Sequence, residues 1–428
     1  MNGGVAVSNA ADVAERMLEG FPDLDRYIAD HPISHWEQAK LRAALAGIAA
    51  YRAFLQRTGR MDTALAHRDA ALAAATGFEL KTRPVTKPRP NGHYLSPAEI
   101  TTFERDGIIG PFPLLSPADA ADVGALCREL HVNDFRENCF LGPDVVKALV
   151  DGGDWLLNYG AQWQAQRIPE LWDIVTMPEL ADRMASLLGD DVICWRSQLF
   201  EKRPGDPGTF WHQTAAFRES SPSDKLAAPE GTDPGMIQLS VWVALTDVTV
   251  ANGALRMVPG TFADGRLEQL YNWGLDNLPA MLASLDPARA EQLLRLRSFS
   301  TGSFFKAQSV FEAMIDVVAD MFAGREVRDL EMRAGECIIF TSLNVHGSHA
   351  NSTRSDSRLA FVGRFTTNDV RVWPDMTTDV FSTPAGQLPF PTEPLKVIQV
   401  HGTDTFGHNR IATAPTEPRR LARPVVGV

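Results

Sequence analysis

The residues of this chain with the clearest chemical meaning lie in the segment Phe210-Trp211-His212-Gln213-Thr214. A mononuclear non-haem Fe(II) oxygenase normally binds its metal through two histidines and one Asp or Glu, and the acidic residue stands two positions after the first histidine. Here that position holds Thr214. A threonine hydroxyl is neutral and sits one atom nearer the backbone than a carboxylate oxygen, so we expect it neither to reach the metal nor to offset its charge. The segment predicts an iron site without its carboxylate ligand.

A second histidine and an arginine complete the candidate site. His346 and His212 each adjoin a strand-like run, so a rolled sheet can bring the two together. Arg358 follows His346 after twelve residues and opens another strand-like run, where its guanidinium could pair with the distal carboxylate of a keto-acid cosubstrate. Glu219 is a conceivable replacement carboxylate if its loop swings toward the metal. His349 is off phase for the strand and is expected in the pocket or at the surface.

The elements that must position these residues are mostly short strands. A helix is expected to begin at Ser96, with Pro97 at its first position and Glu99 closing a capping box. After it come runs of β-branched and aromatic residues bounded by turn formers: 106–112, 192–202, 236–245, 254–258, 336–342 and 359–365. Because no long helices separate most of these runs, they favour a β-sandwich or jelly roll over a doubly wound sheet.

The chain is expected to consist of a helical N-terminal region, a Pro-rich linker and a β-rich domain, at residues 1–80, 81–94 and 95–428. Helices are predicted near residues 10–19, 34–57 and 61–75, where leucines recur at helical spacing. Residues 263–332 interrupt the strands with helical patterns. An insertion between two core strands is a common way to build a lid or a substrate wall.

The composition excludes several classes of protein. A net charge of −12 disfavours a nucleic-acid-binding protein, which usually presents a basic face. No apolar run approaches the roughly 18 residues of a membrane span, and no secretory start is visible, so a cytoplasmic protein without membrane contact is expected. The four cysteines are scattered without CxxC pairing, which predicts free thiols rather than disulfides or a zinc ribbon.

Several segments resemble one superfamily over about three quarters of the chain, from Leu95 to about Arg410. They are Leu95-Ser-Pro-Ala-Glu-Ile, Phe103-Glu-Arg-Asp-Gly-Ile-Ile-Gly-Pro-Phe112, Cys194-Trp-Arg-Ser, Pro204-Gly-Asp-Pro-Gly-Thr-Phe-Trp-His-Gln213, Val241-Trp-Val-Ala-Leu-Thr-Asp247, Ala251-Asn-Gly-Ala-Leu-Arg-Met-Val-Pro-Gly-Thr261 and residues 358–364. The chain is similar to the phytanoyl-CoA dioxygenase superfamily of Fe(II)/2-oxoglutarate enzymes. Within it, the chain resembles the chlorinating enzymes of nonribosomal-peptide pathways, the group of the syringomycin threonyl halogenase.

This resemblance implies a double-stranded β-helix core of the jelly-roll or cupin type, with flanking helices, and a site that uses Fe(II), 2-oxoglutarate and O2. It implies that His212 and His346 are the iron ligands and that Arg358 binds the 2-oxoglutarate carboxylate. The remaining implied roles are a lining of the cosubstrate pocket by Thr209 and Trp242, a place near the metal's anion side for Arg364, and cavity-facing positions for Phe217 and Ser240.

Thr214 departs from the family pattern, which has Ala or Gly at this position in the halogenases and Asp in the hydroxylating relatives. Without a carboxylate, an open position on the metal could take chloride or bromide, and halide rather than hydroxyl would then be transferred to the substrate radical. The leading prediction is a halogenase, with a hydroxylase or other C–H oxidation as the alternative and an inactive binding protein as a third. The resemblance suggests an amino-acid substrate, free or tethered to a peptidyl carrier protein for which the N-terminal helices are a candidate docking region.

Overall fold

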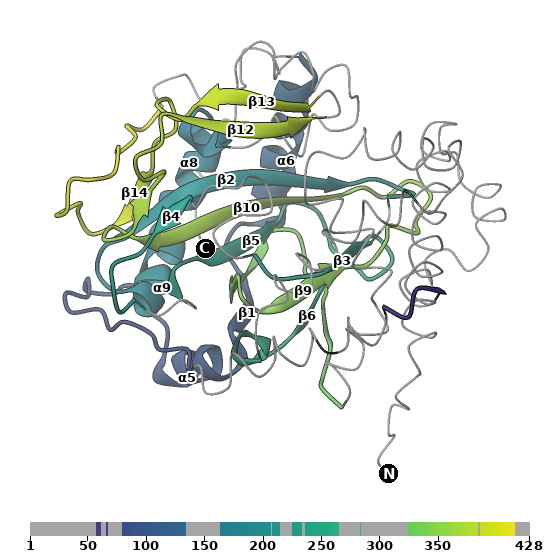
Figure 1. Ribbon diagram of the computed structural model, residues 1–428, viewed down its shortest axis with the longest axis horizontal. Helices are drawn as coiled ribbons and strands as arrows, with labels where there is room; N and C mark the ends of the chain where they lie inside the picture. The colour runs from purple at the N-terminus through teal and green to yellow at the C-terminus, as the bar shows by residue number, and fades with distance from the viewer. Residues whose placement is uncertain are drawn as a thin grey trace.

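Two antiparallel sheets form the core of the protein. The computed structural model describes residues 57–60, 66, 79–133, 163–206, 208–214, 225–232, 236–264, 283, 324–383 and 386–415. A six-stranded sheet has the order β1-β8-β5-β10-β2-β14, and a four-stranded sheet has the order β3-β9-β6-β7 (Figure 1). These sheets confirm the expected double-stranded β-helix with flanking helices.

The strands of the larger sheet are β1 (Ile108–Pro113), β2 (Val192–Lys202), β5 (Leu239–Ala244), β8 (Glu336–Thr341), β10 (Arg358–Thr367) and β14 (Ile398–His401). Those of the smaller sheet are β3 (Thr209–His212), β6 (Leu255–Val258), β7 (Arg328–Leu330) and β9 (Val345–Ser348). Two further pairs are β4 (Leu226–Ala227) with β11 (Arg371–Val372), and β12 (Thr378–Thr383) with β13 (Gly386–Pro391). The described helices are α5 (Pro97–Asp106), α6 (Pro117–Asn133), α8 (Pro169–Thr176) and α9 (Pro178–Leu188), with short 3-10 turns at Gln164–Gln166 and Thr261–Ala263.

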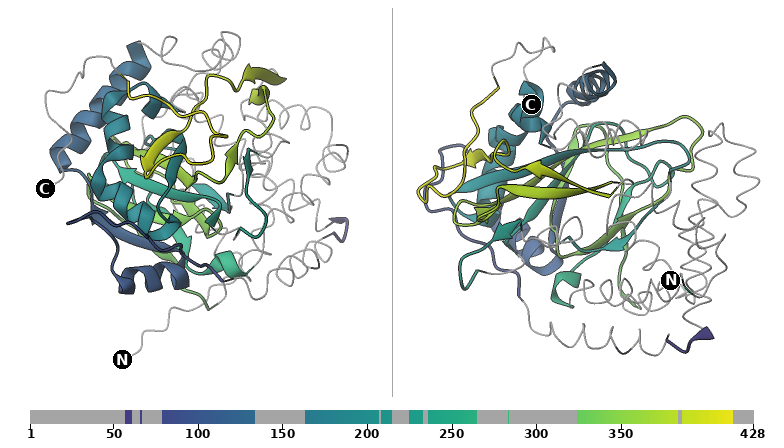
Figure 2. Two further views of the ribbon diagram at one scale, coloured as in Figure 1. Left: turned by 90° about the vertical axis from the view of Figure 1, so that its left-hand side faces the viewer. Right: turned by 45° about the horizontal axis from the view of Figure 1, so that its top comes forward.

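Alternation along the strands separates two apolar layers. Leu359 and Phe361 of β10 belong to a core cluster with residues of α6, α8 and α9, which lie on one side of the larger sheet (Figure 2). Ala360 and Val362 belong to a second cluster that also contains Met257 of the smaller sheet. Since successive side chains of a strand point to opposite faces, every second residue of β10 faces the space between the two sheets. That inner face carries the candidate site.

Most elements expected from the sequence are present. The predicted strand 192–202 coincides with β2, and the predicted helix start is confirmed by a complete capping box between Ser96 and Glu99. Strands β3, β7 and β9 were not anticipated, and β7 falls within the stretch that was expected to be helical. Each has only three or four residues and exists through pairing, as Leu255 and Met257 of β6 pair with both β7 and β9.

Some expectations fall outside the described residues. These are the three N-terminal helices, most of the 263–332 insertion, Cys139, Phe217 and Glu219. The other cysteines, Cys127, Cys194 and Cys337, are buried free thiols, as expected. None of the helices in the described ranges is long and apolar enough to cross a membrane.

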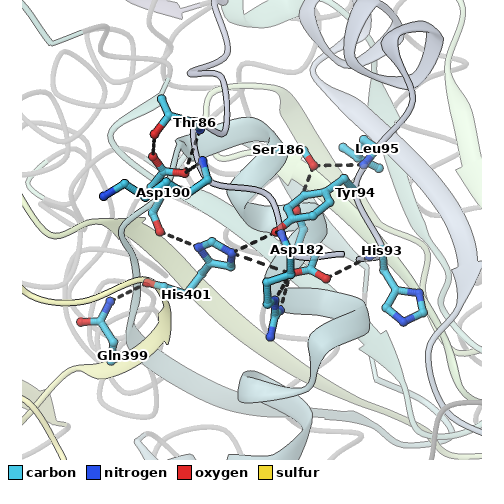
Figure 3. Close-up of polar contacts among 11 residues, drawn as sticks. Thr86, His93, Tyr94, Leu95, Asp182, Ser186, Asp190, Gln399 and His401 are labelled. Atoms are coloured by element: carbon cyan, nitrogen blue, oxygen red, sulfur yellow. Dashed lines mark hydrogen bonds and ion pairs between the residues drawn. The ribbon is translucent and has the colours of Figure 1, made fainter. Parts of the chain in front are cut away.

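The Pro-rich segment before α5 is fastened to α9 by a buried carboxylate (Figure 3). Asp182 is only 1% exposed and accepts hydrogen bonds from Arg89 Nε at 3.1 Å and from the backbone N–H of His93 at 2.9 Å. His401 of β14 adds a contact from the other side, with its Nε2 atom 3.4 Å from the Tyr94 hydroxyl. The polar cluster therefore fixes where the chain enters the β-rich core.

Candidate functional site

The two histidines of the predicted iron site lie side by side. His212 on β3 is paired in register with His346 on β9, and their ring centroids are 4.2 Å apart. Two imidazole nitrogens that bind one ion at about 2.1 Å are about 3 Å apart, which this ring spacing permits. The preceding residue of β3, Trp211, points to the other face of this sheet, where it stacks under the guanidinium of Arg256 at 4.4 Å. The pair fits two adjacent ligands of a single metal.

The ring of His346 is oriented for metal binding. Its Nδ1 atom lies 2.7 Å from the backbone carbonyl of Asn344, and because a carbonyl can only accept, Nδ1 must carry the proton. The Nε2 atom is thus the one left to bind a metal. Burial, and then the neighbouring His212, hold the pKa of His346 well below its usual range, so the ring is neutral at pH 7. A neutral imidazole is the form that ligates metals.

Thr214 is buried beside this pair, two residues after His212, at the position where the sequence predicts a missing carboxylate ligand. Its backbone N–H donates to the carbonyl oxygen of Ser342 at 2.8 Å, and the residue is 7% exposed. Across the described ranges, no group of three or more His, Cys, Asp or Glu side chains is arranged to hold a metal. Within those ranges no third side chain of these types completes a metal-binding group with the two histidines.

Arg358, the first residue of β10, lies beside a second cation on the inner face of the larger sheet. It stands directly opposite Lys202 of β2, and both side chains are buried. The Lys202 ammonium donates to Ser348 Oγ at 2.9 Å, and Ser348 Oγ donates to Thr209 Oγ1 at 2.9 Å. Burial lowers the pKa of Arg358 to about 10, so the guanidinium stays charged at neutral pH.

The two cations Arg358 and Lys202 fit a bound carboxylate. The Nε atom of Arg358 is buried without a hydrogen-bond partner, while its Nη2 atom donates to the carbonyl of Gly253 at 3.1 Å. The guanidinium also lies 5.3 Å from the ring centre of Trp242. An unpaired buried donor costs about 1–3 kcal/mol, which an incoming carboxylate would recover. The residues present therefore fit a keto diacid held by this end and a metal held by the histidines.

Arg364 lies on the same face, six residues further along β10. Its Nη1 atom donates to the hydroxyl of Ser240, which is 3.2 Å from the hydroxyl of Ser342. Ser342 in turn accepts the backbone N–H of Thr214. The predicted anion-side arginine is thus joined to Thr214 through two serines. Burial, and then Arg196, lower the pKa of Arg364 to about 9.

The structure brings together most of the residues that were singled out in the sequence. His212, His346, Thr214, Arg358, Thr209, Trp242, Ser240 and Arg364 all border the space between the sheets. Their chemical roles stay predictions, and Phe217 and Glu219 lie outside the described residues. The His349 side chain is partly exposed, and its Nε2 atom lies 2.6 Å from the Asp329 carboxylate. His349 is therefore a surface residue and does not join His212 and His346 at the candidate metal site.

Two residues of the site were missed in the sequence, Lys202 and Ser348. A signal for Lys202 exists, because three long polar residues, Arg196, Gln198 and Lys202, fall on the same face of β2 and are buried there. Such a set of polar residues in a buried strand marks an inner polar face. That Lys202 lies opposite Arg358 follows only from the pairing of β2 with β10, which no local sequence pattern predicts.

The sequence was compared with models of known protein families. Residues 103–360, more than half of the chain, match the family model described as phytanoyl-CoA dioxygenase (PhyH). The chain belongs to the phytanoyl-CoA dioxygenase family. Members of this family are non-haem Fe(II)/2-oxoglutarate-dependent dioxygenases. The matched segment contains both histidines, Thr214 and Arg358, and it ends shortly before Arg364.

Solved structures agree with the fold of the phytanoyl-CoA dioxygenase family. A structure described as "CytC3 with Fe(II) and alpha-ketoglutarate" is 24% identical, with a TM-score of 0.50, and the match covers 75% of this chain and 94% of that chain. A second CytC3 structure is 23% identical, with a TM-score of 0.52, and covers 78% of this chain and 100% of that chain. At these identities the likeness shows the fold alone. Among curated proteins no match is found.

Proposed function

We propose that this member of the phytanoyl-CoA dioxygenase family is a halogenase that acts on an unactivated C–H bond of an amino acid or a related natural-product precursor. The observation that carries the proposal is Thr214, buried two residues after His212 where a hydroxylase has its carboxylate. With two neutral imidazoles as the protein ligands, one coordination position stays open for chloride or bromide.

Several residues of the chain prepare this chemistry. His212 and His346 hold the metal, and Arg358 with Lys202 binds the distal carboxylate of 2-oxoglutarate. Together the bound iron, 2-oxoglutarate and O2 supply the oxidation that replaces C–H by C–halogen and yields succinate, CO2 and water. A cluster of buried apolar side chains also lies between the sheets, and it limits the access of water to the substrate radical.

Thr214 is compatible with a bound halide. Its hydroxyl can donate a hydrogen bond to an anion, and its methyl can rotate away from it. The positive charge of Arg364, whose effect reaches His346, favours an anion over water at the open position. We therefore propose that Thr214 replaces the Ala or Gly of the halogenases without closing the halide position.

Hydroxylation is the competing outcome, because the Thr214 hydroxyl and methyl also crowd that position. A water ligand needs less space there than a halide does. A hydroxylase would insert oxygen regardless of the halide present. The third reading, a binding protein without catalysis, requires that the two histidines bind no iron.

The experiment is turnover of candidate amino acids with Fe(II), 2-oxoglutarate and O2 at increasing chloride or bromide, read by mass spectrometry of the product and by succinate. The proposal predicts a halogenated product that changes mass with the halide supplied. A purely hydroxylated product at saturating chloride would reject it.

A pair of variants sharpens the result. Thr214→Ala should keep or raise halogenation, since it enlarges the halide position. Thr214→Asp should abolish halogenation by occupying that position, whereas in a hydroxylase the same change should preserve or increase turnover.

A further inference from the structure

Two buried side chains of the larger sheet each carry a polar atom without a partner. Gln238 directly precedes β5 and is 1% exposed, and Thr366 lies near the end of β10 and is 0% exposed. Within the part of the chain that the structure describes, neither Gln238 Oε1 nor Thr366 Oγ1 makes a hydrogen bond. An unpartnered buried polar atom is costly and therefore rare in folded proteins. The two atoms indicate that another group binds beside them.

The two side chains are neighbours on the inner face of the sheet. Strands β10 and β5 lie side by side, and Phe365 pairs with Leu239, so Thr366 and Gln238 are the next residues of the two strands (Figure 1). Phe365 and Leu239 belong to the core cluster on the helical side of the sheet. Because successive side chains of a strand point to opposite faces, Thr366 and Gln238 face the space between the sheets.

Gln238 lies beside the candidate iron site. Its Nε2 atom donates to Ser342 Oγ at 2.6 Å, and the carbonyl oxygen of Ser342 accepts the backbone N–H of Thr214 at 2.8 Å. Phe340, two residues before Ser342, has its ring centre 5.2 Å from that of His346. The inner-face row that holds Gln238 and Ser342 is therefore next to the row that contacts a predicted metal ligand.

Gln238 and Thr366 lie at the opposite end of β10 from the residues that fit 2-oxoglutarate. Arg358 is the first residue of β10, and Thr366 follows it after eight residues, which span about 26 Å of strand. One carboxylate of the keto diacid is assigned to Arg358 and the other to the metal. The group that binds beside Gln238 and Thr366 must therefore belong to a second molecule, which is the substrate.

We propose that Gln238 and Thr366 bind the amino group of the substrate. This inference rests on the proposed function, in which the substrate is an amino acid or a related precursor. The amide oxygen of Gln238 can only accept a hydrogen bond, and the hydroxyl of Thr366 can accept one as well. Since a carboxylate and a halide have no hydrogen to donate, neither satisfies Gln238. An amine donates two N–H groups from one atom and can bind both oxygens.

The charge near Gln238 and Thr366 favours the neutral form of this amine. Arg364 lies on the same face of β10, two residues or about 7 Å before Thr366, and its guanidinium donates to Ser240. A buried cation at this distance opposes the protonation of an amine. The neutral amine still has both N–H donors that the two oxygens need.

The test compares amino compounds with analogues that lack the amine. Common L-amino acids are supplied as free acids and as N-acetylcysteamine thioesters, each beside the same compound with hydrogen in place of the amino group. The stimulated conversion of 2-oxoglutarate to succinate is measured. We expect the best amino compound to exceed its des-amino analogue by about tenfold or more in kcat/KM. Equal values for the two, or no amino compound above the background, would overturn the proposal.

Variants locate the effect at the two side chains. Thr366→Val and Gln238→Leu should each raise the KM of the best amino compound about tenfold and leave the kcat/KM of its des-amino analogue unchanged. Gln238→Glu keeps an acceptor and should restore most of the binding. Thr176→Val is the matched control, because Thr176 lies on α8 and its hydroxyl donates within that helix to the carbonyl of Trp172 at 2.9 Å. An unchanged KM in Thr366→Val and Gln238→Leu would overturn the proposal.

The stability of the substrate-free protein distinguishes a binding site from a buried structural water. Thr366→Val removes a hydroxyl that has no partner among the described residues, so the urea midpoint of unfolding should stay the same or rise. A lower midpoint together with an unchanged KM would show that the hydroxyl holds a structural water only, and the amine site would be wrong.

Two further readouts separate this inference from a failure of the proposed function. The charge-transfer absorption of the anaerobic Fe(II) and 2-oxoglutarate complex should be retained in Gln238→Leu, and its absence from the native protein would reject the proposed function instead. A hydroxylated product with the same preference for amino compounds would reject halogenation and support the amine site.

Discussion

The Nδ1 atom of His346 donates to the backbone carbonyl of Asn344 at 2.7 Å, and this bond leaves Nε2 as the metal-binding nitrogen. Asn344 is held in turn by its own side chain, which donates to the carbonyl of Asp106 at 2.8 Å and is fully buried. The last residue of α5 thereby supports the ring on β9. The orientation of the histidine depends on a residue that touches no metal.

Asn344→Ala should weaken Fe(II) binding about tenfold, because outer hydrogen bonds that orient metal-binding histidines have effects of 10- to 100-fold. The carbonyl that accepts from His346 remains, but the turn that carries it loses its bond to Asp106. Fe(II) affinity measured by anaerobic titration checks this, with Thr101→Ala on the exposed side of α5 as control. Unchanged affinity in Asn344→Ala would show that the turn holds its position without the side chain.

Affinity for 2-oxoglutarate should depend on pH through Lys202. Burial, and then Arg358, hold the pKa of Lys202 well below its usual value. The ammonium is favoured once the dianion is bound, so the free protein must take up a proton whenever pH exceeds the lowered pKa of Lys202. Affinity should therefore fall as pH rises above that lowered pKa, by up to about tenfold per pH unit.

The measurement is the dissociation constant of 2-oxoglutarate, from charge-transfer titration between pH 6 and pH 9. Lys202→Met should bind more weakly at low pH and lose this part of the pH dependence. The assignment of Lys202 to the cosubstrate fails if native protein and variant have parallel pH profiles.

Gly253 is expected to tolerate no side chain. Its φ is +101°, and an added Cβ would lie 2.4 Å from Cδ of Lys202 and 3.1 Å from the carbonyl oxygen of His349. Gly253→Ala should displace Lys202 and disturb the carbonyl that accepts from Arg358, which lowers 2-oxoglutarate affinity about tenfold and destabilises the protein by more than about 1 kcal/mol.

Gly124→Ala is the control for this substitution. Gly124 lies in α6, and an added Cβ would meet only an ordinary contact at 3.5 Å, so stability should rise by roughly 0.5–1 kcal/mol with unchanged affinity. If the two substitutions had equal effects on stability and 2-oxoglutarate affinity, the backbone conformation of Gly253 would not matter for cosubstrate binding.

The polar cluster around Asp182 should affect stability and leave the metal site unchanged. Asp182→Ala removes the acceptor of both Arg89 and the His93 N–H, and we expect a loss of roughly 2 kcal/mol in unfolding free energy by urea denaturation. Asp182→Asn, which keeps one acceptor oxygen, should lose less. A loss of Fe(II) affinity at full stability would contradict a purely structural role.

Local patterns in the sequence were sufficient for long strands and for residues with distinctive chemistry. Strand β2 is an eleven-residue strand rich in β-branched and aromatic residues, and its limits coincide with the prediction. Strand β9, by contrast, is Val-His-Gly-Ser, which has no β-rich pattern and forms because it pairs between β3 and β6. For this reason the residues that pair with His346 could not be predicted from the sequence around it. The role of Lys202 could not be predicted either, because it depends on the pairing of Lys202 with Arg358 on the neighbouring strand.

The chemical outcome depends on one position that the fold does not determine. The sequence predicts that His212, His346 and Arg358 follow the pattern of the phytanoyl-CoA dioxygenase family, and that Thr214 fits neither the hydroxylating nor the halogenating version. A two-histidine iron site with an open position is the central claim, because the proposed halide is assigned a place at that position.

Anaerobic titration with Fe(II) and 2-oxoglutarate, with and without chloride, tests this claim most directly. We predict a charge-transfer absorption that saturates at one Fe(II) per chain, disappears in His346→Ala and shifts when chloride is added. No absorption in the native protein would contradict the claim. So would an absorption that is indifferent to chloride and lost in Glu219→Gln, since a protein carboxylate would then fill the open position.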